Sequence, residues 1–129
     1  MSVSVGDRAE RLAVVGDEQL EQFALATGDR NPIHFDDVYA AETRFGGRVA
    51  HGMLIGGLIS ALLANELPGP GTIYLGQELR FRAPVRPGDR VRCEVEVTEV
   101  DGRRVTLDTR AWVGEMLVVD GTARVLVAE

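Results

Sequence analysis

The residues best suited to chemistry gather in one short segment, GDRNPIH at positions 28–34. Asp29 and His34 stand five positions apart there, and Pro32 between them keeps the residue before it out of helical geometry. A carboxylate and an imidazole that converge on one water molecule can hold it and relay its proton. The spacing therefore points to an acid–base pair for water chemistry, with turn-forming Asx residues beside a structural histidine as the alternative interpretation.

His51 and Gly52 directly precede an apolar segment, residues 53–65, that is expected to be helical. The first turn of a helix carries unpaired backbone N–H groups and a partial positive charge, and glycine leaves its N–H open to close approach. Gly52 is therefore a candidate to stabilise negative charge on a docked carbonyl oxygen. The structural alternative is a glycine cap preceded by a linking histidine.

Two other kinds of chemistry, metal binding and nucleophilic attack by a serine, have weaker support in the sequence. Asp29 and His34 fall short of the three protein ligands usual in a catalytic zinc site, so no metal is expected. Ser60 lies one turn before Leu63 but lacks the sharp turn of a nucleophilic serine. It is expected to bond back to a helix carbonyl unless its face lines a pocket.

The charge of the chain is acidic overall and basic in one place. Twenty acidic and fourteen basic residues give a net charge of −6, which argues against nucleic-acid binding. Residues 80–92 nevertheless hold five arginines against one acid. Because arginine binds phosphate groups bidentately, this segment is a candidate phosphate contact, with a solvated strand face as the alternative. The candidates are Arg80, Arg82 and Arg86.

A length of 129 residues, 45% of them hydrophobic, fits a single domain over residues 1–129. The one cysteine, Cys93, excludes an intrachain disulfide and is expected to be a buried small hydrophobe. No segment reaches the roughly 18 apolar residues of a membrane span, and the N-terminus does not resemble a signal peptide. We therefore expect a cytoplasmic protein with no membrane segment.

The elements that must position these residues begin with a strand around residues 8–15 and an amphipathic helix that Asp17 is placed to cap and Gly28 to end. Residues 28–35 are expected to form an irregular loop or turn, and residues 36–44 a short helix.

The rest of the chain divides into one helix and a run of strands. Residues 53–65 are uncharged and apolar on almost every side, which predicts a buried helix. After the PGPG break at residues 68–71 the chain is strand-like, with hairpin turns at Asp101–Gly102 and Gly114–Glu115. Helices segregated from an antiparallel meander define an α+β fold, and one helix against a curled sheet of about five strands is the hot-dog arrangement.

Together these motifs resemble the (R)-specific enoyl-CoA hydratases of the MaoC-like dehydratase family. The likeness covers roughly residues 5–127. Its motifs are Phe23, the segment 28–34, Ala40, the HGML run at 51–54, the IYLGQ run at 73–77, Pro84–Val85 and Gly88–Asp89. The resemblance implies a hot-dog homodimer that needs no cofactor and reversibly adds water to a trans-2-enoyl-CoA thioester, giving (R)-3-hydroxyacyl-CoA.

Carried onto this chain, the resemblance assigns a role to each candidate. It implies that Asp29 and His34 activate the water and that the Gly52 N–H binds the thioester carbonyl. Asn31 would brace the loop or touch the thioester. The residues implied to line the acyl pocket are Ser60 and Leu63. A place in fatty-acid metabolism or polyhydroxyalkanoate supply follows from the same likeness.

Three alternatives remain open. A 3-hydroxyacyl-thioester dehydratase acting on acyl-carrier-protein or long-chain CoA substrates would use the same pair in reverse. A hot-dog thioesterase would hydrolyse the thioester, and a non-catalytic module would only bind acyl-CoA. The complete GDxNPxH motif favours hydration over the last two, because a binding module is expected to have lost Asp29 or His34.

Overall fold

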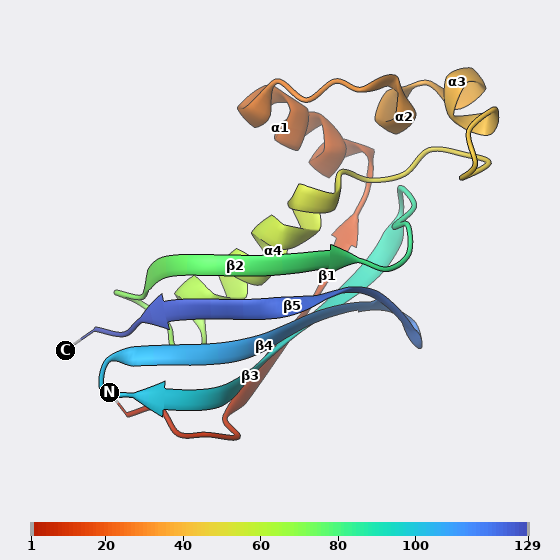
Figure 1. Cartoon of the computed structure of the whole chain (residues 1–129). Coiled ribbons are helices and arrows are strands. Elements are labelled where there is room, and N and C mark those ends of the chain that lie inside the picture. Colours follow the sequence, from red (N-terminus) through yellow and green to blue (C-terminus); the bar gives the residue numbers. More distant parts are fainter. Residues whose placement is uncertain (1, 129) are drawn as a thin grey trace.

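The computed structural model describes residues 2–128 as one curled antiparallel sheet of five strands that wraps around a long helix (Figure 1). The strands are β1 (Arg8–Val15), β2 (Ile73–Phe81), β3 (Asp89–Asp101), β4 (Arg104–Val113) and β5 (Met116–Leu126), in the sheet order β1-β3-β4-β5-β2. The helices are α1 (Asp17–Thr27), α2 (Pro32–Phe35), α3 (Asp37–Ala41) and α4 (Gly52–Asn65). This is the α+β architecture expected from the sequence.

One face of the sheet is buried because its strands alternate apolar and polar residues. On β3 the buried side chains are Val91, Cys93, Val95 and Val97. Their partners on the neighbouring strand β4 are Val113, Ala111, Thr109 and Leu107, in that order. Ile55, Ile59 and Leu62 of α4 belong to the same core cluster. Burying an aliphatic side chain of this size stabilises the fold by roughly 1.5–3 kcal/mol.

Cys93 behaves as expected for a buried thiol. Burial raises its pKa to about 11, so the thiol stays neutral near pH 7. It packs in the core as a small apolar side chain.

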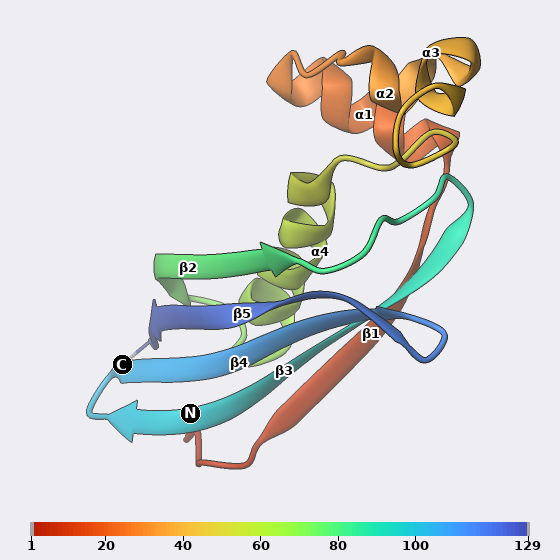
Figure 2. The same ribbon diagram turned by 45° about the vertical axis from the view of Figure 1, so that its right-hand side comes forward.

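The helix α4 is less enclosed than its apolar sequence predicts. Met53 is 58% exposed, and Gly57 and Ala64 are also exposed. The sheet covers only the opposite side of the helix, since β1, β2, β3 and β4 contact α4 from that side (Figure 2). The prediction of a helix buried nearly all round is therefore wrong for the single chain.

The caps of α1 differ in part from the prediction. The N-cap is Gly16, whose N–H donates to Oε1 of Gln19 at 2.9 Å. Asp17 is the first helical residue and accepts a hydrogen bond from Arg48 at 2.8 Å instead of capping the helix. Gly28 ends the helix in the left-handed conformation, with φ of 82°, as expected.

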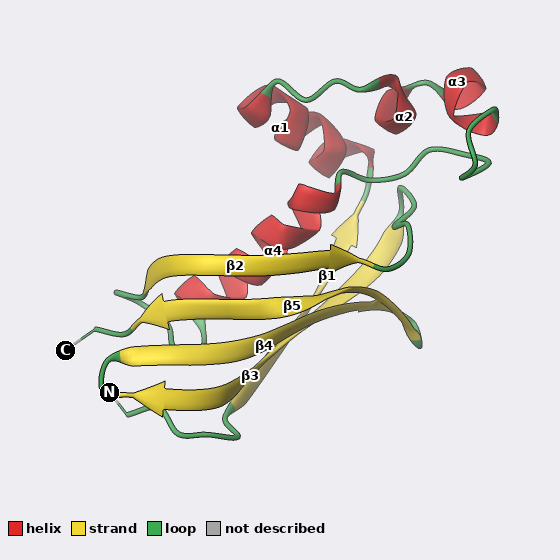
Figure 3. Cartoon of the chain, in the orientation of Figure 1, coloured by secondary structure: helices red, strands yellow, loops and turns green. Residues whose placement is uncertain are grey.

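The three short helices α1, α2 and α3 lie together at one end of the sheet, beyond the first turn of α4 (Figures 1 and 2). The loops that join α1 to α4 all lie at this end, and both chain termini lie at the other (Figure 3). The fold thus brings the segment 28–34 to the N-terminus of α4.

Candidate functional site

The segment that follows α1 is a tight structured turn. The Oδ1 atom of Asp29 accepts a hydrogen bond from the Asn31 N–H, and Oδ1 of Asn31 accepts one from the Ile33 N–H, both at 3.2 Å. Asn31 thereby caps α2, a single turn with Pro32 at its first position. The expected irregular loop at residues 28–35 is helical over its last four residues, because the Asn-Pro pair starts a helix rather than preventing one.

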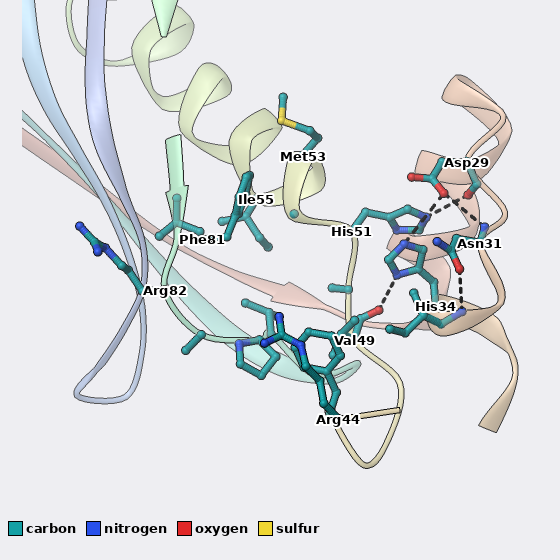
Figure 4. A pocket seen from close by; sticks show the side chains of 18 residues that line it. Asp29, Asn31, His34, Arg44, Val49, His51, Met53, Ile55, Phe81 and Arg82 are labelled. Carbon is teal, nitrogen blue, oxygen red and sulfur yellow. Dashed lines mark hydrogen bonds and ion pairs between the residues drawn. The ribbon is translucent and has the colours of Figure 1, made fainter. Parts of the chain in front are cut away.

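This turn aims His34 into the protein, where the side chain is 8% exposed. Its Nδ1 lies 2.7 Å from the carbonyl oxygen of Val49. A carbonyl can only accept, so Nδ1 carries the proton and Nε2 of the neutral ring keeps a free lone pair. Nε2 lies 3.9 Å from Oδ1 of Asp29, whose side chain is 45% exposed. The predicted acid–base pair is therefore brought together, with His34 buried and Asp29 partly exposed (Figure 4).

A second histidine completes the group. The ring of His51 stacks on that of His34 with centroids 3.8 Å apart and planes 28° apart. Its Nε2 lies 3.0 Å from the main-chain oxygen of Asp29, and the residue is 2% exposed. Burial lowers the pKa of His51, and the hydrogen bond to Asp29 opposes that shift only in part. The sequence shows His51 only as the residue before a helix; no spacing rule links it to Asp29.

Gly52 is the first residue of α4, so its N–H has no acceptor within the helix. A Cβ built on Gly52 would lie 2.7 Å from the Phe81 ring, which shows how closely that ring covers the helix N-terminus. His51, rather than Gly52, is the N-cap residue.

These groups share one cavity of about 590 Å³ (Figure 4). Asp29, Asn31, His34, His51 and Gly52 all line it. The remaining wall is largely apolar and includes Ile55, Phe81 and Val85. The cavity thus combines an acid–base pair, a free helix N–H and an apolar wall.

A second cavity of about 540 Å³ lies along α4 and β2. Ser60 lines it, together with Gly56, Gly57 and Leu79, and Met53 lines both cavities. Leu63 lies in the hydrophobic core, 1% exposed, and lines neither cavity. The structure therefore separates the two candidates for the acyl pocket, because three residues fall about 60° short of a full helical turn and Leu63 faces the core.

The predicted phosphate contacts also separate. Arg86 donates to the main-chain oxygens of Phe45, Gly47 and Arg48, so its guanidinium braces a loop and is not free to bind phosphate. Arg80 has carboxylates of Glu78 and Asp120 within 4 Å, and it lines neither cavity.

Two arginines do line the first cavity. Arg82 donates to Asp120 at 3.2 and 3.3 Å and keeps half of its side chain exposed. The guanidinium of Arg44 lies 4.6 Å from the centre of the Phe45 ring, and no carboxylate within residues 2–128 pairs with it. Arg44 stands outside the arginine-rich segment 80–92, so its sequence position gave no signal for this contact.

The acid–base pair and the second histidine also bear on metal binding. Asp29, His34 and His51 each offer a ligand atom, and the three atoms lie within 4.8 Å of one another. The Nε2 of His51 already donates to a carbonyl and its Nδ1 is buried, which leaves Asp29 and Nε2 of His34 as the accessible pair. Two ligands are fewer than the three usual in a catalytic zinc site, so the absence of a metal stays a prediction.

Known proteins are similar to this chain in sequence and in fold. A family model described as MaoC like domain matches residues 5–120. The chain belongs to the MaoC-like family. The MaoC-like chain is 53% identical over 107 residues to a 3-hydroxybutyryl-CoA dehydratase of Methylorubrum extorquens, covering 81% of this chain and 68% of that protein. It is 44% identical over 125 residues to an (R)-specific enoyl-CoA hydratase of Aeromonas caviae, covering 95% of this chain and 93% of that protein.

A solved structure extends the likeness to three dimensions. The (R)-hydratase of A. caviae involved in PHA biosynthesis superposes with a TM-score of 0.94 at 42% identity, covering 98% of each chain. The hot-dog fold and the family resemblance predicted from the motifs are confirmed for the MaoC-like chain. Within residues 2–128, no helix has the length and apolar character needed to cross a membrane.

Proposed function

We propose that this MaoC-like protein is an (R)-specific enoyl-CoA hydratase, a hydro-lyase that adds water reversibly to a trans-2-enoyl-CoA and gives (R)-3-hydroxyacyl-CoA. One observation carries the proposal: Asp29 and His34 face each other across 3.9 Å in a cavity that also contains the first N–H of a helix. The activities named for the relatives from M. extorquens and A. caviae support it.

The acid–base step follows from the hydrogen bond to Val49. Because Nδ1 of His34 is the protonated nitrogen, Nε2 is free to accept a proton. A water held by Nε2 and the Asp29 carboxylate gives one proton to Nε2 as its oxygen bonds to the β-carbon of the enoyl group. Asp29 stays ionised and orients the water. Such a step contributes about 10²–10⁴-fold.

The electron pair of the double bond moves toward the thioester oxygen as the water adds. The N–H of Gly52 and the positive end of α4 stabilise that enolate-like oxygen, a contribution of about 10²–10³-fold for one donor. The proton on Nε2 of His34 then passes to the α-carbon. Hydrogen and hydroxyl thus arrive from the same side, and His34 returns to its neutral form.

The remaining site residues bind and brace in this proposal. Asn31 holds the turn that carries Asp29. Ser60 lines the second cavity, which we assign to the acyl chain. Leu63 acts only through the packing of the core behind that wall. Arg44 and Arg82, at the first cavity, bind the CoA phosphates.

The protein is further proposed to act as a cytoplasmic homodimer. The strand β2 is an edge of the sheet, and it exposes Ile73, Leu75 and Phe81. An open edge with exposed apolar residues favours pairing with a second chain. Size-exclusion chromatography with light scattering measures the oligomeric state, and a monomer at micromolar concentration would contradict the homodimer. The predicted role in supplying (R)-3-hydroxyacyl-CoA to polyhydroxyalkanoate synthesis or fatty-acid metabolism is part of the same proposal.

The function is tested with crotonyl-CoA and the purified protein. Loss of the enoyl absorbance without release of free thiol is expected, and a stereospecific 3-hydroxyacyl-CoA dehydrogenase should then oxidise only the (R) product. Thiol release would indicate a thioesterase. No reaction with crotonyl-CoA, but reaction with acyl-carrier-protein or long-chain thioesters, would indicate the dehydratase alternative. Binding without any turnover would indicate an acyl-CoA-binding module.

Variants connect the activity to the site. His34→Ala is expected to remove most activity without unfolding the protein. His34→Asn is the sharper test, because an Asn side chain retains an N–H for the Val49 carbonyl while lacking the basic Nε2. Near-normal turnover in either folded variant would overturn the role of His34.

A further inference from the structure

His51 lies between the two halves of the proposed site. Its side chain contacts the Asp29–His34 pair, and its main chain continues directly into Gly52. The proposed hydration steps involve no atom of this side chain. Its role, which rests on the proposed hydration, follows from two contacts and one feature of its ring.

The first contact anchors Asp29. The other hydrogen bonds of Asp29 are local: its N–H donates to Oγ1 of Thr27, and its Oδ1 accepts from the N–H of Asn31, each two residues away. The bond from Nε2 of His51 to the Asp29 carbonyl, at 3.0 Å, spans 22 positions. Among the described residues, it is the hydrogen bond that ties Asp29 to a distant part of the fold.

The second contact fixes the plane of His34. One edge of that ring is held by the Val49 carbonyl, and its face lies on His51 with centroids 3.8 Å apart. His51 is in turn enclosed by Phe23 at 4.7 Å and Phe35 at 5.7 Å between centroids. At 2% exposure, His51 has little freedom to move. The ring that supports His34 is therefore itself fixed.

The third feature is the buried Nδ1 atom of His51. Its Nε2 faces a carbonyl and so carries the proton, which leaves Nδ1 unprotonated. Nδ1 is buried and has no hydrogen-bond partner among residues 2–128. A proton there would be buried without a hydrogen-bond acceptor and close to His34, and burial lowers the pKa of His51. The imidazole nitrogen of the stack that faces the Asp29 carboxylate with a free lone pair is Nε2 of His34.

We infer that His51 is a positioning residue: it holds the Asp29 main chain and the His34 ring at a set distance from the N–H of Gly52. Hydration needs the water to lie at the β-carbon while the thioester oxygen of the same substrate is bound by the N–H of Gly52. A displacement of about 1 Å in such an arrangement lowers turnover about 10²-fold. His51 connects the two halves through one side chain and one peptide bond.

Two variants separate the contacts. His51→Gln keeps an N–H donor at the reach of Nε2 but removes the ring. His51→Phe keeps a stacked ring but removes the donor. Each is expected to lower kcat on crotonyl-CoA about 10–100-fold while KM changes less than about threefold, because substrate contacts remain and alignment is lost. His51→Ala loses both contacts, so its kcat is expected to be lower than that of either variant.

A matched control guards against a purely structural effect. Val105→Ala truncates a buried residue at the start of β4 that lines neither cavity. It is expected to lower the free energy of unfolding while leaving kcat intact. A loss of kcat in Val105→Ala equal to that in the His51 variants at matched stability would overturn the positioning role, as would unchanged kcat in folded His51→Phe and His51→Gln.

Nuclear magnetic resonance gives a readout independent of turnover. The ¹⁵N shifts of His34 report whether Nδ1 still carries the proton, and the Asn31 amide reports the turn beside Asp29. Both are expected to change in His51→Phe and to stay near wild type in Val105→Ala. Unchanged shifts would contradict the inference even if the protein proved inactive as a hydratase. Wild-type inactivity with changed shifts would instead count against the proposed function alone.

Discussion

The Oδ1 atom of Asp29 and the Nε2 atom of His34 lie 3.9 Å apart, beyond direct hydrogen-bond reach but within reach of one shared water. The two atoms subtend an angle of roughly 90° at a water oxygen about 2.8 Å from each, which lies close to the angle between the two O–H bonds that the water donates to them. The pair is thus arranged to hold a water rather than to bond to each other.

Asp29→Asn is expected to lower kcat/KM on crotonyl-CoA at least about 10²-fold. The melting temperature should hardly change, because the side chain is 45% exposed and Asn retains the oxygen that accepts from the Asn31 N–H. Enoyl absorbance gives the rate and circular dichroism the melting temperature. A rate within threefold of wild type in the folded variant would refute the role of the carboxylate.

Removing the N–H of Gly52 is expected to lower kcat about 10²–10³-fold. Proline is tolerated at the first position of a helix, so Gly52→Pro removes this N–H without breaking α4. Its ring would meet Phe81, since a Cβ at Gly52 lies 2.7 Å from that ring. The substitution is therefore made in a Phe81→Ala background, with Phe81→Ala and Gly52→Ala/Phe81→Ala as controls. Equal rates in all three proteins would exclude the N–H from catalysis.

The low pKa of His51 predicts a pH dependence of stability. The unfolded side chain titrates near its ordinary value of 6.5, and the folded one below it. The unfolded state therefore binds more protons as the pH falls below about 6.5, and the free energy of unfolding decreases by up to about 1.4 kcal/mol per pH unit down to the folded pKa. Above about 6.5 the contribution is complete.

Urea unfolding of wild type and His51→Gln between about pH 7.5 and pH 5 measures this contribution. Between these two pH values the free energy of unfolding should fall less in the variant than in wild type, although the variant is less stable at the higher pH. Parallel curves would mean that His51 does not titrate differently in the two states. The carboxylates contribute to both curves alike and cancel in the difference.

The predictability of the site depends on how far along the chain its contacts reach. Asp29, Asn31 and His34 lie on one turn, so their spacing alone predicts that they gather, and Gly52 is marked by the helix that follows it. The contact of His51 with the Asp29 carbonyl spans 22 positions and ends on a main-chain atom, which carries no sequence signature. Only the folded chain reveals it.

The arginines fail as predictions for the same reason. Arg86 looks free in a basic segment, yet the carbonyls that it binds lie 38 to 41 positions earlier. Arg44 stands alone in sequence and reaches the cavity through the loop that Arg86 braces. The sheet was more accessible to prediction, because the alternation of Val91, Cys93 and Val95 sets its buried face residue by residue.

Gly121→Ala is expected to destabilise the fold by about 3 kcal/mol. A Cβ there would lie 1.9 Å from the main-chain oxygen of Glu78, so β5 and β2 would have to separate. Gly57→Ala is the matched control: its Cβ would meet no atom within 4 Å, and alanine favours the helix by up to about 1 kcal/mol. Chemical denaturation gives both values, and similar stabilities for the two variants would contradict the close approach at Gly121.

Arg44→Ala is expected to raise KM for crotonyl-CoA about 5–10-fold, which corresponds to about 1 kcal/mol for a partly exposed phosphate contact. It should leave kcat unchanged, because Arg44 lines the cavity without touching the Asp29–His34 pair. Crotonyl-pantetheine, which lacks the nucleotide phosphates, should be hydrated equally by wild type and variant. Arg124→Ala on β5, an exposed arginine that lines neither cavity, is the control for net charge. A KM increase of the same size for both substrates, or in Arg124→Ala, would assign the effect to folding or to overall charge rather than to phosphate binding.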